Sequence, residues 1–145
     1  MREAGAFVAS DATFEALRIE ALLPAYGADI SEDNLAQEVA RTRQAISFNK
    51  GCYLGQEPIA RIDAMGHVNR KLCGLKLASV PVPAVGSAVF AGESEVGQVT
   101  SSVLSPGSGL PVALAYLRTG STESGTELRV RADGEDVRAV VFRGE

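Results

Sequence analysis

Apolar and polar residues alternate through the second half of the chain, from about residue 69 onward. Leu75 and Leu77 flank Lys76, so both leucines would lie on one face of an extended strand. The same period of two recurs downstream, and turn residues such as glycine, proline and aspartate separate the repeats. The six predicted strands lie around residues 75–77, 88–90, 96–100, 111–117, 127–131 and 137–142. Short strands with regular turns over this length predict a compact antiparallel barrel.

The first half of the chain favours helices joined by loops. Asp11 is a candidate N-cap for a first helix, which Pro24 should end near residue 23. Phe14, Leu17 and Ala21 recur at helical spacing and should form its buried face. Almost no strand precedes the barrel for this face to cover. It must therefore pack on the barrel, on another chain, or on an amino-terminal region that this sequence does not contain.

Two further helices are predicted before the barrel. One should follow Asn34, with Gln37 as a weak capping partner. The residues expected to face inward are Leu35, Val39, Thr42 and Ile46, and those expected to face solvent are Glu38, Arg41 and Arg43. The other helix should span residues 56–64 and stop before Gly66. The expected fold class is therefore α+β, with helices and loops followed by a six-stranded antiparallel β-barrel.

Composition restricts the possible partners. The 145 residues carry a net charge of −4 and give a pI near 5.1, which argues against direct nucleic-acid binding because that needs a basic face. No apolar run approaches the roughly 20 residues of a membrane span, so no membrane contact is expected. Two cysteines make no disulfide framework. A reducing cytoplasm is the expected location.

One of these cysteines lies between two glycines in residues 50–57, which read Lys-Gly-Cys-Tyr-Leu-Gly-Gln-Glu. Structural cysteines are usually surrounded by apolar side chains. Cys52 instead follows a lysine, and Glu57 and Pro58 indicate that a helix starts shortly after it. Such a thiol should ionise more easily than a free cysteine of pKa about 8.5, and could then ligate iron or exchange sulfur. The alternative is a tight loop that holds an inert thiol.

The octapeptide matches the signature of the folate-binding YgfZ-type proteins, relatives of the glycine-cleavage T-protein (aminomethyltransferase). Further segments that resemble this superfamily, in the same order, are residues 14–21, 60–62, 66–70, 96–102, 105–106 and 113–116. One departure is Leu22, where the family usually has glycine. The resemblance implies that residues 1–68 end a folate-binding domain and that residues 69–145 form its carboxy-terminal barrel. We expect an amino-terminal region of the same protein, absent from this chain, to complete the folate cavity.

The resemblance also implies a function. Proteins of this type bind tetrahydrofolate and act in the assembly or repair of iron–sulfur proteins without a classical catalytic activity, and they require the cysteine that matches Cys52. Because clusters are normally held by several thiolates, a cluster at Cys52 would be transient and shared with a partner, a second copy or a small thiol. The expected partners are iron–sulfur assembly or client proteins. The alternatives are a tetrahydrofolate-dependent aminomethyltransferase, whose members usually lack the octapeptide, and a non-catalytic protein-interaction barrel.

Several side chains are candidates for binding folate or its anionic tail. They are Arg18, Glu20, Lys50, Tyr53, Gln56 and Arg61. By resemblance Arg18 lines the folate site, where a planar guanidinium suits a carboxylate or a pterin. The alternative for Arg18 is a salt bridge with Glu15 or Glu20. The cations Lys50 and Arg61, with Arg70, could steer an anion or simply be solvated. Gln56 is expected to cap its helix, and Tyr53 to wall the site or join the core.

Two further residues are candidate partners for this chemistry. Cys73 lies in the first predicted strand and is expected to be small core packing. His67 is the only histidine, and it could pair with Cys52 if the fold brings the two together. The alternative is that His67 bonds to nearby backbone.

Overall fold

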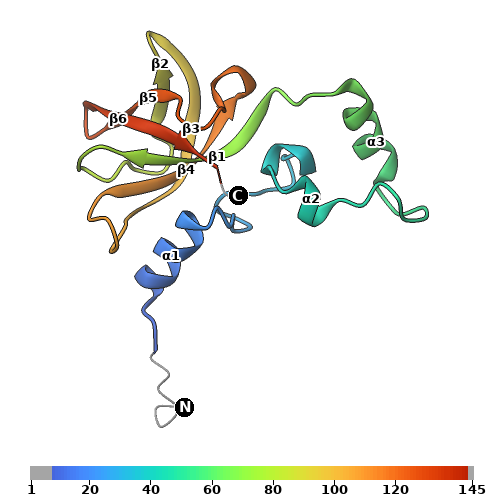
Figure 1. The fold of residues 1–145 in the computed structure, drawn as a ribbon, viewed down its shortest axis with the longest axis horizontal. Coiled ribbons are helices and arrows are strands. Elements are labelled where there is room, and N and C mark those ends of the chain that lie inside the picture. Colours follow the sequence, from blue (N-terminus) through green and yellow to red (C-terminus); the bar gives the residue numbers. More distant parts are fainter. Residues whose placement is uncertain (1–7, 144–145) are drawn as a thin grey trace.

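The computed structural model describes residues 8–143 of the chain. Within these residues six strands close into a barrel in which every strand pair is antiparallel, as the alternating pattern predicts (Figure 1). The strands are β1 (Arg70–Leu77), β2 (Ala88–Ala91), β3 (Ser94–Leu104), β4 (Pro111–Arg118), β5 (Glu127–Ala132) and β6 (Glu135–Phe142). Their order around the barrel is β1-β4-β3-β2-β5-β6. The α+β class is confirmed.

The helical elements come mainly before the barrel. They are α1 (Asp11–Glu20), the 3₁₀ helix η2 (Ala36–Val39), α2 (Thr42–Ala45), α3 (Gln56–Met65) and the 3₁₀ helix η3 (Thr119–Ser121). Helix α1 packs on β3 and β4, whereas α3 and the loop before it lie to one side of the barrel (Figure 1). We call residues 47–66 the arm. None of the described helices is both long and apolar enough to cross a membrane.

Two apolar layers surround strand β4, whose residues are buried on both faces except the last. On the inner face, Ala115 and Leu117 join Leu75 and Leu77 in the barrel core. On the outer face, β4 contributes to a second cluster under α1, made by Ile19, Leu72, Val112, Leu114 and Tyr116. The barrel and α1 therefore share a core, and this shared core fixes the position of α1.

Helix α1 presents a different face to the barrel from the one its sequence predicts. Its N-cap is Ser10, whose hydroxyl accepts the Thr13 amide at 3.2 Å, so the prediction of Asp11 was wrong by one residue. Ala16, Arg18 and Ile19 are the buried residues. The predicted inward residues Phe14 and Leu17 are instead 63% and 59% exposed, and Ala21 is exposed too. Arg18 faces the barrel because its ion pair with Asp29 is buried there.

The chain leaves α1 through a left-handed residue, Leu22, with φ of 53°. The Leu23 amide donates to the Arg18 carbonyl at 2.7 Å, which closes the helix end as glycine does in other helices. The side chain of Leu22 lies against Gly74, where a Cβ would come within 2.5 Å of its Cδ2 atom. Position 22 has a backbone conformation that favours glycine, and the leucine found there packs its side chain against Gly74.

The single helix predicted after Asn34 is wrong, since the segment is broken into η2 and α2. Ala40 separates them with a φ of 60°, which no helix continues through. Glu38, which was expected to be solvated, is buried because it forms an ion pair with Arg70 at 3.1 Å. Leu35, which was expected to be buried, is 43% exposed.

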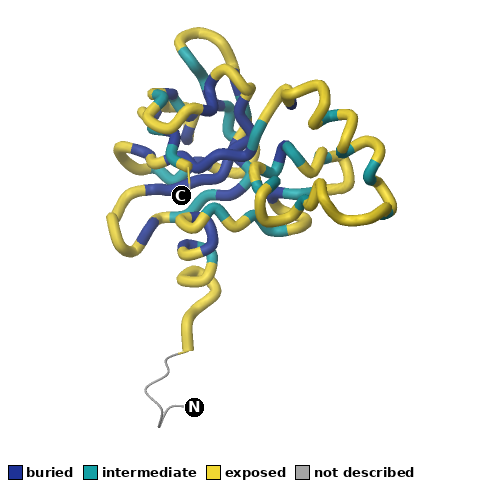
Figure 2. Tube along the Cα trace, turned by 45° about the vertical axis from the view of Figure 1, so that its right-hand side comes forward, coloured by how far each residue is buried: buried dark blue, intermediate teal, exposed yellow. Residues whose placement is uncertain are grey.

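The third helix is confirmed, with one residue added at its end. Gly55 and Gly66 flank α3, and both have left-handed backbones with φ of 85° and 79°. No residue of α3 is buried, and exposed residues dominate the whole arm (Figure 2). A hydrogen bond of 2.9 Å from the Gln37 amide to the Ile59 carbonyl connects the arm to η2.

Candidate functional site

Arg18 lies in a buried polar network under the barrel. Its Nε atom donates to the Glu15 carboxylate at 2.9 Å, and its Nη1 atom lies 2.7 Å from Asp29 Oδ2. The remaining N–H groups contact the Leu23 carbonyl, Ser101 Oγ and Glu15 again. The Glu15 hydrogen bond and the nearby Asp29 charge raise the Arg18 pKa, although burial opposes them. All three nitrogens of the guanidinium therefore have partners within the protein.

Asp29 completes this network from the other side. Its carboxylate accepts the Ala25 amide at 3.0 Å and the Thr100 hydroxyl at 2.5 Å, and its side chain has no solvent exposure. Through Asp29, Arg18 ties α1 to β3. In this geometry Arg18 forms the salt bridge with Glu15 that was its alternative role, and a second one with Asp29. Its assignment to a folate site stays a prediction.

Glu20 lies at the opposite end of α1 from its N-cap, beside a separate cavity of about 400 Å³. The Ser105 hydroxyl donates to its carboxylate. Lys76 and Phe142 line the same cavity, and the Lys76 ammonium lies 5.0 Å from the centroid of the Phe142 ring. Glu20 and Arg18 thus lie in different surroundings, as expected for positions two residues apart on a helix.

Cys52 is exposed on the arm. The neighbouring Lys50 places its ammonium 4.3 Å from the centroid of the Tyr53 ring, in a cation–π contact. The N-cap of α3 is Gly55, without a side-chain cap, so the expected capping by Gln56 is wrong. Gln56 is the first helical residue, and its backbone amide donates to the Tyr53 carbonyl at 3.2 Å. Arg61 is exposed on the same helix. The arm therefore holds a thiol and two cations within one exposed segment.

The predicted site residues thus form two groups rather than one constellation. Arg18 and Glu20 belong to α1, whereas Cys52 and the remaining candidates belong to the arm (Figure 1). Cys52 lines neither the 400 Å³ cavity nor the larger one described below. Within residues 8–143, no three His, Cys, Asp or Glu side chains are grouped to hold a metal ion. These residues alone do not make a folate cavity or a complete cluster site.

His67 and Cys73 have the structural roles that were the alternatives to a chemical one. His67 Nδ1 lies 3.0 Å from the Met65 carbonyl oxygen, a local backbone contact. Cys73 is 2% exposed in the barrel core. Burial raises the pKa of its thiol, and the nearby Arg143 and Lys71 charges oppose this effect. Cys73 is thus a packing residue that lies near two cations.

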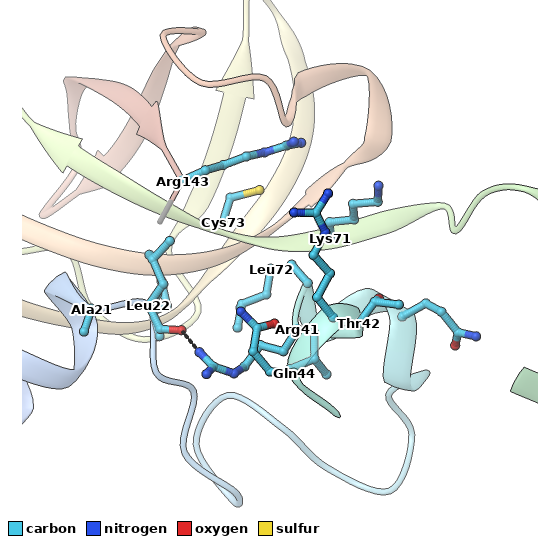
Figure 3. A pocket seen from close by; sticks show the side chains of 14 residues that line it. Ala21, Leu22, Arg41, Thr42, Gln44, Lys71, Leu72, Cys73 and Arg143 are labelled. Atoms are coloured by element: carbon cyan, nitrogen blue, oxygen red, sulfur yellow. Dashed lines mark hydrogen bonds between the residues drawn. The ribbon is translucent and has the colours of Figure 1, made fainter. Parts of the chain in front are cut away.

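Sequence analysis missed a second cavity of about 440 Å³ on the barrel (Figure 3). It lies between the end of α1, residues 37–44, β1 and the chain after β6. Its basic lining residues come from three separate segments: Arg41 and Arg43, Lys71, and Arg143. No sequence motif joins positions so far apart. The only signal was a local excess of basic residues at positions 41 and 43, which were expected simply to face solvent.

A closed antiparallel barrel preceded by a helix that shares its core defines a recognisable class of domain. The sequence profile of the glycine cleavage T-protein C-terminal barrel domain matches residues 70–144. The chain therefore belongs to the glycine cleavage T-protein family. The predicted superfamily is confirmed in this respect.

Relatives with assigned functions agree with this membership. The chain is 34% identical over 142 residues to an aminomethyltransferase from Moorella thermoacetica, an alignment that covers 98% of the chain and 38% of that relative. An aminomethyltransferase from Aquifex aeolicus is 32% identical over 88% of the chain and 35% of its own length. The crystal structure of the aminomethyltransferase T of the glycine cleavage system from Bartonella henselae matches with a TM-score of 0.80 and 28% identity, covering 89% of the chain and 36% of that structure. The chain thus spans little more than a third of these relatives.

Proposed function

We propose that this chain is the carboxy-terminal part of a folate-binding YgfZ-type protein that acts in the assembly or repair of iron–sulfur clusters. Its essential group is the Cys52 thiol, and its cofactor is tetrahydrofolate. The observation that carries the proposal is the exposure of Cys52 within the complete Lys-Gly-Cys-Tyr-Leu-Gly-Gln-Glu segment. Ordinary packing gives no reason for that segment.

The arm suits a thiol that works on another protein. Cys52 is exposed and α3 after it buries no residue, so a partner can reach the sulfur without the barrel unfolding. A reducing compartment such as the cytoplasm keeps this thiol free. Because Cys52 is a single ligand, an iron–sulfur cluster would be cargo whose other ligands come from the partner or from a small thiol.

The folate part of the proposal needs a further segment. Phe14 and Leu17 expose an apolar stripe on α1 that the barrel does not cover. The relatives extend well beyond the matched region, since the chain covers only 35–38% of them. We propose that an amino-terminal region of the same protein packs on this stripe. The same region would also supply most of the folate cavity. Glu20, on the same helix, borders the cavity of about 400 Å³.

A complementation experiment tests the role of the thiol. Cys52→Ala is introduced into the full-length protein in its native host, and the activities of several iron–sulfur enzymes are measured. We expect them to fall together, because alanine removes the sulfur and little else from an exposed position. Asp63→Ala, an exposed substitution on the same arm outside the octapeptide, is the control and should leave the activities unchanged.

The second candidate is a tetrahydrofolate-dependent aminomethyltransferase, which the names of the relatives favour. The same strain discriminates between the two functions. Glycine-cleavage activity that requires this protein but not Cys52 would support the transferase. Unchanged iron–sulfur enzyme activities in Cys52→Ala would remove the leading proposal. If neither activity depends on the protein, a non-catalytic interaction barrel is the remaining alternative.

A further inference from the structure

The cavity of about 440 Å³ has an unusual charge for this acidic protein. Arg41, Arg43, Lys71 and Arg143 line it, and no aspartate or glutamate does. The whole chain nevertheless carries a net charge of −4. Figure 3 shows Lys71, Arg41 and Arg143, from separate segments, around Cys73 and Leu72. The fold thus gathers four cations into one concave surface.

These cations lack the carboxylate partners that five other arginines have. Within residues 8–143, the arginines at 18, 70, 129, 131 and 138 each lie within 4.0 Å of a carboxylate. The four cations of the cavity make no such ion pair with a described residue. Arg41 donates only to the Leu22 carbonyl at 3.4 Å, and Arg143 to the Thr122 hydroxyl at 3.0 Å. Most of their N–H groups are therefore free to meet a ligand.

We propose that this cavity binds a small polyanion. Four cations without a compensating carboxylate repel one another, and a ligand with about three or four negative charges would neutralise them. A single carboxylate would leave most of this charge unmatched. A diphosphate or a tricarboxylate has suitable charge and size, and paired oxygens of either can accept two N–H groups from one guanidinium.

The surroundings of the cations favour binding over simple solvation. Arg41 and Lys71 are half-buried, so a ligand would meet them where water screens charge less than on an open surface. The floor of the cavity is apolar and includes Leu72 and Leu114 together with the buried Cys73. The hydrogen bond to the Leu22 carbonyl holds the Arg41 guanidinium before a ligand arrives (Figure 3). Such preorganisation lowers the entropy cost of binding.

Calorimetric titration of the 145-residue chain with inorganic pyrophosphate tests the proposal. We expect saturable binding that weakens as salt is added. Lys71→Gln and Arg43→Gln should each weaken it about fivefold, because each removes one charge-assisted contact. Arg118→Gln removes an equal charge from an exposed residue outside the cavity and should leave the affinity unchanged. Urea unfolding of each variant shows that the fold is retained.

Citrate distinguishes the two chemical sources of the charge. Clearly tighter citrate binding would identify a carboxylate-rich ligand, and clearly tighter pyrophosphate binding would identify a phosphate ligand. Equal affinity would mean that the site recognises the negative charge of either group. Each of these results supports a polyanion site if the Lys71 and Arg43 variants weaken it. Absence of saturable binding at millimolar pyrophosphate and citrate, or equal weakening by Arg118→Gln, would overturn the proposal. The titration uses no folate and no iron, so its failure leaves the proposed function untouched.

Discussion

At the scale of single residues, the Arg18–Asp29 pair shows how one buried contact sets the orientation of a helix. Asp29 has no solvent exposure and shares its oxygens among Arg18, Thr100 and a backbone amide. Glu15 contacts the same guanidinium but is 43% exposed. The two acids therefore differ in burial while sharing a partner. That difference gives a matched test.

We expect Asp29→Asn to lower the free energy of unfolding by about 3 kcal/mol, because it removes the buried counter-charge of Arg18 and leaves only the half-exposed Glu15. Glu15→Gln should cost less than about 1 kcal/mol, because solvent screens that pair. Urea denaturation of both variants measures the difference. Equal losses in the two variants would show that Asp29 is not the residue that fixes Arg18.

Tyr116 gives a second prediction at this scale, concerning pH. Its hydroxyl is buried without a hydrogen-bond partner among the described residues. Burial first, and then the Glu38 charge, raise the pKa of Tyr116 to about 12, although Arg70 opposes them. An unfolded tyrosine has a pKa of about 10. Between these values the folded chain keeps a proton that the unfolded chain loses, so stability should fall as the pH rises from about 10 to 12.

Absorbance titration checks this prediction. The wild-type chain should show one late phenolate transition with a midpoint near pH 12. Tyr116→Phe should remove that transition and flatten the loss of stability in the same pH window. It should not destabilise the protein at neutral pH, since the lost hydroxyl had no partner. A late transition that persists in Tyr116→Phe would contradict the assignment.

At the scale of elements, the sequence predicts the barrel well and the helical half less well. A strand needs only a period of two and a turn, and both are local, so Leu75 and Leu77 face inward as predicted. The secondary structure and burial of residues 34–46 depend instead on contacts with residues distant in the sequence. Glu38 is buried because Arg70, on a later strand, pairs with it. No local pattern contains that information.

The same contrast holds for the candidate site. The octapeptide is contiguous, so its exposed Cys52 could be found from sequence. The basic cavity joins residues as distant as Arg41 and Arg143. Only the closed order of the strands, with β1 between β4 and β6, brings the end of the chain beside Lys71 and Cys73.

Gly97 provides the prediction at this scale. It lies in β3 opposite Leu117 of the paired strand β4, and a Cβ there would come within 2.1 Å of the Tyr116 carbonyl oxygen. Since backbone cannot yield as a side chain does, Gly97→Ala should destabilise the barrel by about 3 kcal/mol or more. Gly120→Ala is the control, because its Cβ would meet no atom within 4 Å. Thermal unfolding compares them, and similar midpoints would contradict the close approach.

At the scale of the whole molecule, the protein combines a closed barrel with a lightly attached arm. The barrel strands bond to neighbours on both sides, whereas α3 buries nothing and is connected to η2 by the Gln37 bond. Local opening should therefore be far easier in residues 47–66 than in the barrel. This difference is what would let Cys52 meet a partner while the rest of the fold stays intact.

Limited trypsin digestion should reveal the difference. We expect the first cuts after Lys50 and Arg61 on the arm, followed by a resistant fragment that contains the barrel. Lys76 and Arg118 are the controls, since they too are exposed but their backbones lie within paired strands. Mass spectrometry over time identifies the order. Early cleavage after Lys76 or Arg118 would mean that the barrel opens as readily as the arm, and that the thiol is not presented by an independently mobile segment.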